Sequence, residues 1–237
     1  MRSILLSRTT IVRWAATTSL FGAALITGCN STSNDGFVGA PVLIKVTGQT
    51  DISAQVATDA GPYVFTVVDT AGTGVQGVTV NFTISGPATL ATTSAVTDQG
   101  GSVLTSVHFA QTVGTVTITA TASGITAPAV VHTSSYAAPP SKFTIAGGNN
   151  QIGVHGTALS EAIAVLVTDQ YDNPVNSILI SLQPSAGTVG TASARTGLDG
   201  RLTTTYTLPA TPGVQTITAS ALFNGTTINL TFTETGT

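Results

Sequence analysis

Residues 78–84, with the sequence VTVNFTI, alternate apolar and polar side chains at every position. Successive side chains of a β-strand point to opposite faces, so a period of two puts all four apolar residues on one side. The same alternation returns in residues 227–233 (TINLTFT). Further alternate residues share a face of one strand: Leu202, Thr204, Tyr206 and Leu208. After residue 30 no stretch has helical periodicity. The sequence therefore predicts an all-β protein whose strands each have one dry face.

Two copies of one pattern follow each other along the chain. Residues 67–69 (VVD) recur 100 positions later as VTD, and residues 114–120 (GTVTITA) recur 99 positions later as GVQTITA. One deletion between strands explains the change in spacing. A period of this length is typical of two copies of an independently folding domain rather than of a solenoid.

Turn sequences divide each copy into short strands. They are rich in Gly, Asn, Asp and Pro and lie at residues 71–74 (AGTG), 98–101 (DQGG), 172–174 (DNP) and 199–200 (DG). About seven short strands per copy, each with one dry face, must pack sheet on sheet. We therefore predict two tandem immunoglobulin-like β-sandwich domains, at residues 38–135 and 142–237, joined by a Pro-rich linker at residues 136–141 (YAAPPS).

The order of signals is more specific in the second copy. Residues 167–175 read VTDQYDNPV and are followed by TGLDG at residues 196–200. This order resembles the bacterial immunoglobulin-like repeats of the invasin and intimin adhesins. The first copy departs from it, with TG at residues 73–74 where the second has NP. The resemblance implies a domain that serves as a spacer or as a binding head, and it assigns no role to individual side chains.

The N-terminal 28 residues have the three parts of a secretion signal. The only charges are Arg2, Arg8 and Arg13, and residues 14–26 are uncharged and mostly apolar, shorter than the ~20 residues that span a bilayer. The segment ends in Ile26-Thr27-Gly28-Cys29, which resembles the lipobox of bacterial lipoprotein precursors.

The lipobox resemblance implies a signal peptide at residues 1–28 and a diacylglycerol thioether, with palmitate-type acyl chains, on Cys29. Residues 29–37 would then be the lipidated N-terminus and a flexible tether. Residue 30 is Asn rather than Asp, which in lipoproteins of Gram-negative bacteria implies transport to the outer membrane. The alternative is an ordinary secretory signal that happens to end near a cysteine. Cys29 is the single cysteine, so no intrachain disulfide is available.

Charge is sparse in the rest of the chain. Removal of the signal takes three of the seven cations and none of the ten acidic residues, so the formal charge becomes 4 − 10 = −6. Such a chain has no basic patch that would neutralise phosphates, and we expect no nucleic-acid partner.

The sequence does not predict an enzyme. His108, His132 and His155 have no neighbouring ligand residues, and we expect no catalytic group, cofactor or small-molecule substrate. An internal isopeptide bond between a lysine and an asparagine needs an acid nearby. The first copy has Lys45 but no glutamate, so in this chain only Lys142 in the second copy, with Glu161 or Glu234 as the acid, is a candidate.

Calcium is the one cofactor that the acidic residues suggest. Asp169, Asp172 and Asn173 lie within five residues of one another, and Asp199 would approach from another turn. Oxygen ligands of this kind bind Ca²⁺, although the spacing is not that of an EF-hand loop. The alternative is turn chemistry, in which Asp and Asn side chains bond their own backbone.

These features predict a lipid-anchored cell-envelope protein that acts as a non-catalytic structural or adhesive module. Its membrane contact would be the N-terminal lipid, and its partner a protein or a glycan. The alternative is a ligand-binding accessory module for envelope or extracellular polysaccharide. Sugar sites stack aromatic rings, and the single tryptophan lies in the predicted signal, which counts against that alternative.

Overall fold

The computed structural model describes residues 39–237, and in this range every regular element is a β-strand. The first copy of the repeat contains β1 (Leu43–Val46), β2 (Ala54–Gln55), β3 (Asp59–Val68), β4 (Thr79–Ser85), β5 (Ala88–Leu90), β6 (Ser94–Val96), β7 (Ser102–Phe109), β8 (Thr115–Ala122) and β9 (Ala129–Tyr136). The second copy contains β10 (Lys142–Gly147), β11 (Ile152–Gly153), β12 (Ile163–Thr168), β13 (Leu179–Pro184), β14 (Thr188–Val189), β15 (Ser193–Arg195), β16 (Arg201–Thr204), β17 (Tyr206–Thr207), β18 (Gly213–Phe223) and β19 (Thr226–Gly236).

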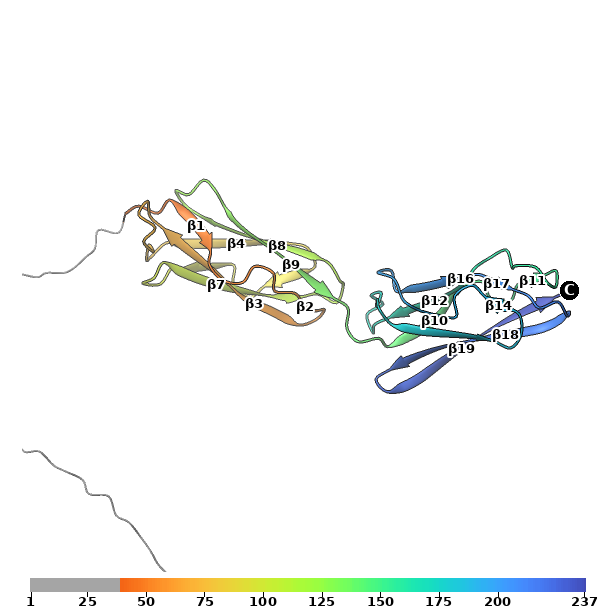
Figure 1. The fold of residues 1–237 in the computed structure, drawn as a ribbon. Helices are drawn as coiled ribbons and strands as arrows, with labels where there is room; N and C mark the ends of the chain where they lie inside the picture. The colour runs from red at the N-terminus through yellow and green to blue at the C-terminus, as the bar shows by residue number, and fades with distance from the viewer. Residues whose placement is uncertain (1–38) are drawn as a thin grey trace, which may run out of the picture. The chain divides into compact units, whose positions relative to one another are not determined.

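Each copy folds as a sandwich of two main sheets (Figure 1). In the first sandwich the strand orders are β1-β3-β7-β5 and β2-β9-β8-β4-β6. In the second they are β10-β12-β16 and β11-β19-β18-β13-β15, with a short β14-β17 pair beside them. In both copies the first strand contributes to one sheet and the next short strand pairs in parallel with the last strand of the other sheet. The prediction of an all-β chain with tandem immunoglobulin-like sandwiches is confirmed.

The alternating stretches form the strands that they predict. In β4 the side chains of Val80 and Phe82 are buried, and Thr79, Asn81 and Thr83 are exposed. The buried faces of the two sheets meet in a hydrophobic core, where the rings of Phe82 and Phe65 lie 5.3 Å apart. Burial of the dry faces is therefore what holds the sheets together.

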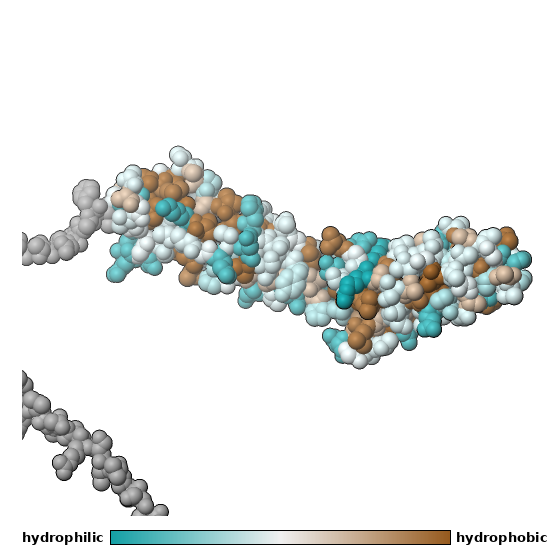
Figure 2. Space-filling model, in the orientation of Figure 1, coloured by the Kyte–Doolittle hydropathy of each residue, from teal (hydrophilic) through white to brown (hydrophobic). Residues whose placement is uncertain are grey.

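The described residues contain two separate hydrophobic cores, one in each copy of the repeat. The second core repeats the plan of the first, with a T-shaped contact between Phe143 and Phe223 whose ring centroids are 6.1 Å apart. On the face drawn in Figure 2, apolar residues form separate patches among weakly polar ones. Much of the exposed surface of the strands is therefore made of Thr, Ser and Asn side chains rather than of charged ones.

The turns that end at Gly101 and Gly200 have the same geometry in the two copies. Gly101 and Gly200 have φ of +76° and +71°, and an added Cβ would lie 2.5 Å from the carbonyl oxygens of Val67 and Val167, respectively. Neither the dihedral nor the close approach tolerates a side chain. The turn sequences at residues 98–101 and 199–200 are therefore structural requirements of the repeat.

No helix in residues 39–237 has the length and hydropathy needed to span a bilayer. The predicted signal and Cys29 lie outside the described residues.

Candidate functional site

Asp169 organises the turn that follows β12. Its Oδ1 accepts hydrogen bonds from the backbone N–H groups of Tyr171 at 2.8 Å and Asn173 at 2.9 Å. Its Oδ2 accepts hydrogen bonds from the backbone N–H of Ala138 and from Nδ2 of Asn173, both at 2.9 Å. The side chain is fully buried, so these four donors replace the water that the carboxylate has lost.

Two opposing effects set the pKa of Asp169. Burial alone would raise the pKa, because it disfavours the charged form. The hydrogen bonds from Asn173, Ala138 and Tyr171 outweigh burial and hold the pKa below its ordinary value. Asp169 is therefore an ionised acceptor that fixes the surrounding backbone.

The first copy uses Asp69 in the same way. Its Oδ1 accepts hydrogen bonds from the N–H groups of Ala71 and Thr73, both at 2.9 Å, and its Oδ2 accepts one from Gly39 at 3.1 Å. In each copy, one aspartate thus connects the segment before the first strand to the turn after β3 or β12, respectively. Thr73 contributes no side-chain bond of the kind that Asn173 makes.

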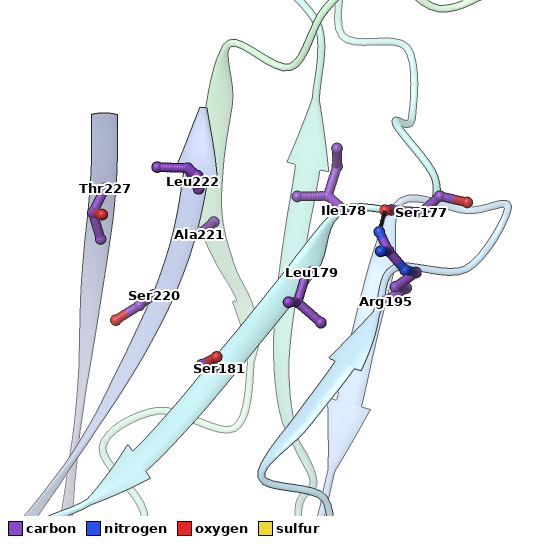
Figure 3. A pocket seen from close by; sticks show the side chains of 9 residues that line it. All are labelled: Ser177, Ile178, Leu179, Ser181, Arg195, Ser220, Ala221, Leu222 and Thr227. Atoms are coloured by element: carbon purple, nitrogen blue, oxygen red, sulfur yellow. Dashed lines mark hydrogen bonds between the residues drawn. The ribbon is translucent and has the colours of Figure 1, made fainter. Parts of the chain in front are cut away.

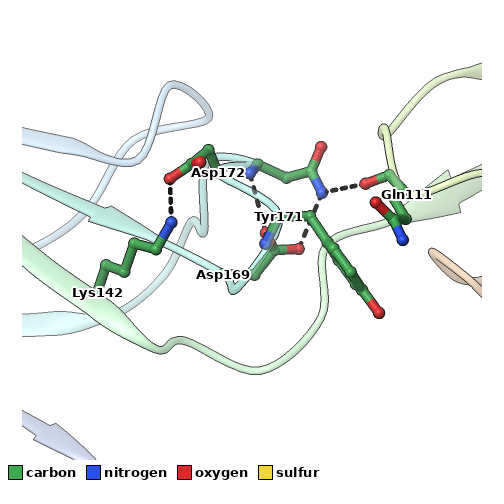
Figure 4. Close-up of polar contacts among 6 residues, drawn as sticks. Gln111, Lys142, Asp169, Tyr171 and Asp172 are labelled. Atoms are coloured by element: carbon green, nitrogen blue, oxygen red, sulfur yellow. Dashed lines mark hydrogen bonds and ion pairs between the residues drawn. The ribbon is translucent and has the colours of Figure 1, made fainter.

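Asn173 adds bonds to the loop between β7 and β8. Its Nδ2 donates to the carbonyl oxygen of Gln111 at 2.7 Å, and its Oδ1 accepts the N–H of Val113 at 3.0 Å. Figure 4 shows Gln111 beside the turn that carries Asp169 and Tyr171. With 5% of its surface exposed, Asn173 satisfies both ends of its amide inside the protein.

The four calcium candidates do not converge on one point. Asp169 and Asn173 bond to each other, Asp172 forms an ion pair with Lys142 (Figure 4), and Oδ1 of Asp199 accepts the N–H of Arg201 at 3.0 Å. Residues 39–237 hold no group of three or more His, Cys, Asp or Glu side chains placed to share a metal ion. Asp169 and Asp199 accept hydrogen bonds from the backbone of their own turns, which is the turn chemistry that the sequence left as the alternative to calcium binding.

The other reactive side chains are also apart. Lys142 pairs with Asp172, whereas Glu234 is fully buried and accepts the N–H of Gln151 through Oε2 at 2.7 Å. The structure thus supplies no contact between Lys142 and Glu234 of the kind that an isopeptide bond needs.

The three histidines have unrelated partners. His108 Nδ1 lies 2.7 Å from Oδ1 of Asp59. His132 bonds to Thr117 in the neighbouring strand, and His155 to the carbonyl oxygen of Thr237.

The outer face of the second sandwich carries a hollow of about 430 Å³ over β13, β15 and β18 (Figure 3). Leu179 and Leu222 line it with 51% and 63% of their surfaces exposed. The register pairs Ile180 with Ala221, so the two leucines are the next opposed pair. Arg195 lies opposite Leu179 on the other side and donates from Nη1 to the carbonyl oxygen of Ser177 at 2.6 Å.

This leucine pair is absent from the first copy. Val80 pairs with Ala122 as Ile180 pairs with Ala221, which makes Thr79 and Ser123 the counterparts of Leu179 and Leu222. In the first copy Thr79 lies in β4, and β8 ends at Ala122, just before Ser123, so the sandwich forms there without leucines at these positions. Leu179 and Leu222 form an exposed apolar pair that the needs of the fold do not explain.

Comparisons with known proteins agree on the fold. No protein-family profile matches the chain, and no curated protein matches its sequence. Among solved structures, Yersinia pseudotuberculosis InvD is 16% identical, with a TM-score of 0.53, over 80% of this chain and 58% of InvD. The Escherichia coli adhesin FdeC is 17% identical, with a TM-score of 0.43, over 82% of this chain and 64% of FdeC. The chain thus spans about 58% of the InvD structure and shares its fold.

Proposed function

We propose that this chain is a lipid-anchored cell-envelope protein whose sandwiches form a non-catalytic adhesive module. The observation that carries the adhesive role is the exposed pair Leu179 and Leu222, which the second copy has and the first copy folds without. Apolar side chains held on a rigid sheet are suited to contact with a partner, since they lose no backbone entropy on binding.

The placement of the polar groups supports a role without turnover. Catalysis needs an acid, a base or a nucleophile brought together with its partners. In residues 39–237 the buried aspartates are saturated by N–H donors, and the three histidines lie in separate contacts.

The lining of the hollow favours a protein partner over a polysaccharide. Leucine, serine, threonine, isoleucine, alanine and one arginine surround it, and no aromatic ring does. Sugar recognition relies on ring stacking, whereas leucines beside an arginine are typical of protein contacts. Polysaccharide binding remains the second candidate and is one arm of the test.

Replacement of both Leu179 and Leu222 by lysine is expected to weaken adhesion about tenfold, since that loss corresponds to about 1.4 kcal/mol of contact energy. The measurement is the binding of cells that display the full chain to immobilised matrix proteins, glycans and envelope components. Thr79→Lys is the matched control, because it puts a lysine at the counterpart of Leu179 in the first copy. Equal binding by wild type and double variant would show that the leucine pair is not the contact surface. No binding by wild type to any surface would favour a pure spacer.

The anchor is proposed from the lipobox resemblance at Ile26-Thr27-Gly28-Cys29. Acyl chains on Cys29 would hold the chain at the membrane, because each buried CH₂ contributes about 0.8 kcal/mol. Asn30 favours the outer membrane as the destination.

A fatty-acid label supplied to growing cells is expected to mark the wild-type chain and to be absent from Cys29→Ala. Cys29 is the only cysteine, so no other residue offers a thiol for the thioether. The label is read on the immunoprecipitated protein after gel electrophoresis. Asn30→Ala, which keeps the cysteine, is the control and should label normally. Equal labelling of Cys29→Ala and wild type would contradict the anchor.

A further inference from the structure

The last strand of the second sandwich has an open edge. β19 pairs with β18 along its whole length, from Thr226 to Gly236. On its other side β11 pairs only with Thr235 and Gly236. Within the described part of the chain, residues 226–231 therefore have no strand beside them on that side.

The backbone groups that face this open side can be identified. Thr233 donates its N–H to Oδ1 of Asn149 and accepts the N–H of Asn150, and both partners lie on the side away from β18. In an antiparallel pair the direction of these groups alternates along the strand. The N–H and C=O groups of Thr227, Asn229 and Thr231 therefore point outward, and no hydrogen bond among residues 39–237 uses them.

This edge lacks the features that usually keep strand edges from pairing. Residues 226–231 (TTINLT) contain no charge and no proline, and the register with β18 runs through them without a bulge. The first copy differs. In the first copy Ser135 lies opposite Gly114, just as Gly236 lies opposite Gly213 in the second, so Ser135 and Gly236 are counterparts. Seven residues earlier in each chain segment, Pro128 is therefore the counterpart of Asn229. Proline has no N–H to offer, which blocks the equivalent edge.

The sequence of the open edge is complementary to itself. Residues 227–231 read TINLT, so an antiparallel copy centred on Asn229 would place Thr227 opposite Thr231 and Ile228 opposite Leu230. From this symmetry and the free backbone groups we infer that the edge of β19 binds the same edge of a second copy of this chain. The two strands join the sheets of two molecules about a twofold axis at Asn229.

The proposed register satisfies the outward groups and adds apolar burial. Thr227, Asn229 and Thr231 become hydrogen-bonded pairs across the axis, because all three direct N–H and C=O outward. Ile228 and Leu230 are only partly buried against the core and meet across the axis on the inward face. Threonine pairs and aliphatic pairs are both favourable across strands. This self-association goes beyond the proposed adhesive role, and the two can fail independently.

Sedimentation of the full chain, extracted from membranes in a mild detergent, tests the pairing. We expect a wild-type dimer and an Asn229→Lys variant that dimerises about tenfold more weakly or worse, because two like charges would face each other at the axis. Val130→Lys is the matched control. It puts a lysine on the corresponding strand of the first copy, where Val130 is 41% exposed, and should leave the dimer unchanged.

A covalent trap tests the register. Asn229→Cys should give a reducible dimer on electrophoresis, because hydrogen-bonded antiparallel pairs place Cα atoms about 5.5 Å apart, within disulfide reach. Wild type, in which Cys29 is the single cysteine, supplies the background for this measurement. A monomeric wild type, or a dimer that Asn229→Lys leaves intact while circular dichroism shows a folded variant, would overturn the inference. If Asn229→Lys fails to fold, the Asn229→Cys crosslink decides. Absence of a crosslink above the background would then overturn the inference.

Discussion

Asp169→Ala is expected to lower the free energy of unfolding of the second sandwich by roughly 3 kcal/mol or more. The carboxylate accepts four hydrogen bonds at a site with no exposed surface, and three of the donors are backbone N–H groups. Each buried donor left without an acceptor costs about 1–3 kcal/mol. Alanine also releases the segment at Ala138 from the turn, so the loss should exceed that of a single hydrogen bond.

Denaturant unfolding followed by circular dichroism measures this loss, and Asp172→Asn is its matched control, because the backbone at Asp172 has a φ of +68°, which asparagine adopts more readily than alanine. Asp172 lies three residues further along the same turn, but its carboxylate is exposed and pairs only with Lys142. Exposed ion pairs contribute about 0–1 kcal/mol, so the control should change stability little. If both variants lost the same stability, the role assigned to the Asp169 hydrogen bonds would be wrong.

The free energy of unfolding measured at acidic pH provides a second test of the same variant. The pKa of Asp169 is lower in the folded protein than in the unfolded chain, where it is about 3.9. Its ionised form therefore stabilises the fold above about pH 4, and that contribution is lost as the pH falls through the folded pKa. Asp169→Ala should lose less stability on acidification than wild type does.

The strands and their copies could be predicted because their signals are local. Alternation in residues 78–84 depends only on the geometry of one strand, and the structure buries Val80 and Phe82 as that geometry requires. The repeat also allowed the β-sandwich architecture to be predicted, since two matching sets of short strands have few other ways to bury their apolar faces.

The role of Asp169 was only half visible in the sequence. Its bonds to Tyr171 and Asn173 are ordinary turn chemistry, two and four residues away. The bond to Ala138 spans 31 residues and depends on how the entering segment crosses the sheet. Whether Asp199 would approach Asp169 was likewise a tertiary question, and the structure uses Asp199 to cap its own turn instead.

Leu179 and Glu234 each depart from the expected sequence pattern of their strand. Leu179 stands where the first copy has Thr79, on a face whose other side chains are mostly hydroxylic, and so departs from the alternation. Glu234 has the same strand parity as Ile228, Leu230 and Phe232, which places a carboxyl on the inward face of β19. Neither departure reveals its consequence until burial and neighbours are known.

Glu234→Gln is expected to stabilise the second sandwich at high pH by at least about 1 kcal/mol, because a charge at this buried position is costly. Burial raises the pKa of Glu234, and the hydrogen bond from Gln151 offsets only part of that rise. Its Oε1 has no hydrogen-bond partner among the described residues, so replacing this oxygen by an amide nitrogen breaks no hydrogen bond. The negative charge, where present, also contributes to raising the pKa of the buried Tyr206.

The sign of this effect separates it from that of Asp169. A carboxyl whose folded pKa is raised stabilises the fold fully below its unfolded pKa of about 4.3, and the contribution is lost as the pH rises through the folded value. Wild type should therefore lose stability over that rise, whereas Glu234→Gln should not, and the two should be nearly equal in acid. Glu161→Gln, at an exposed glutamate, is the control and should follow wild type. A Glu234→Gln variant that is less stable at every pH would show instead that the carboxylate is needed, and that an unseen donor satisfies Oε1.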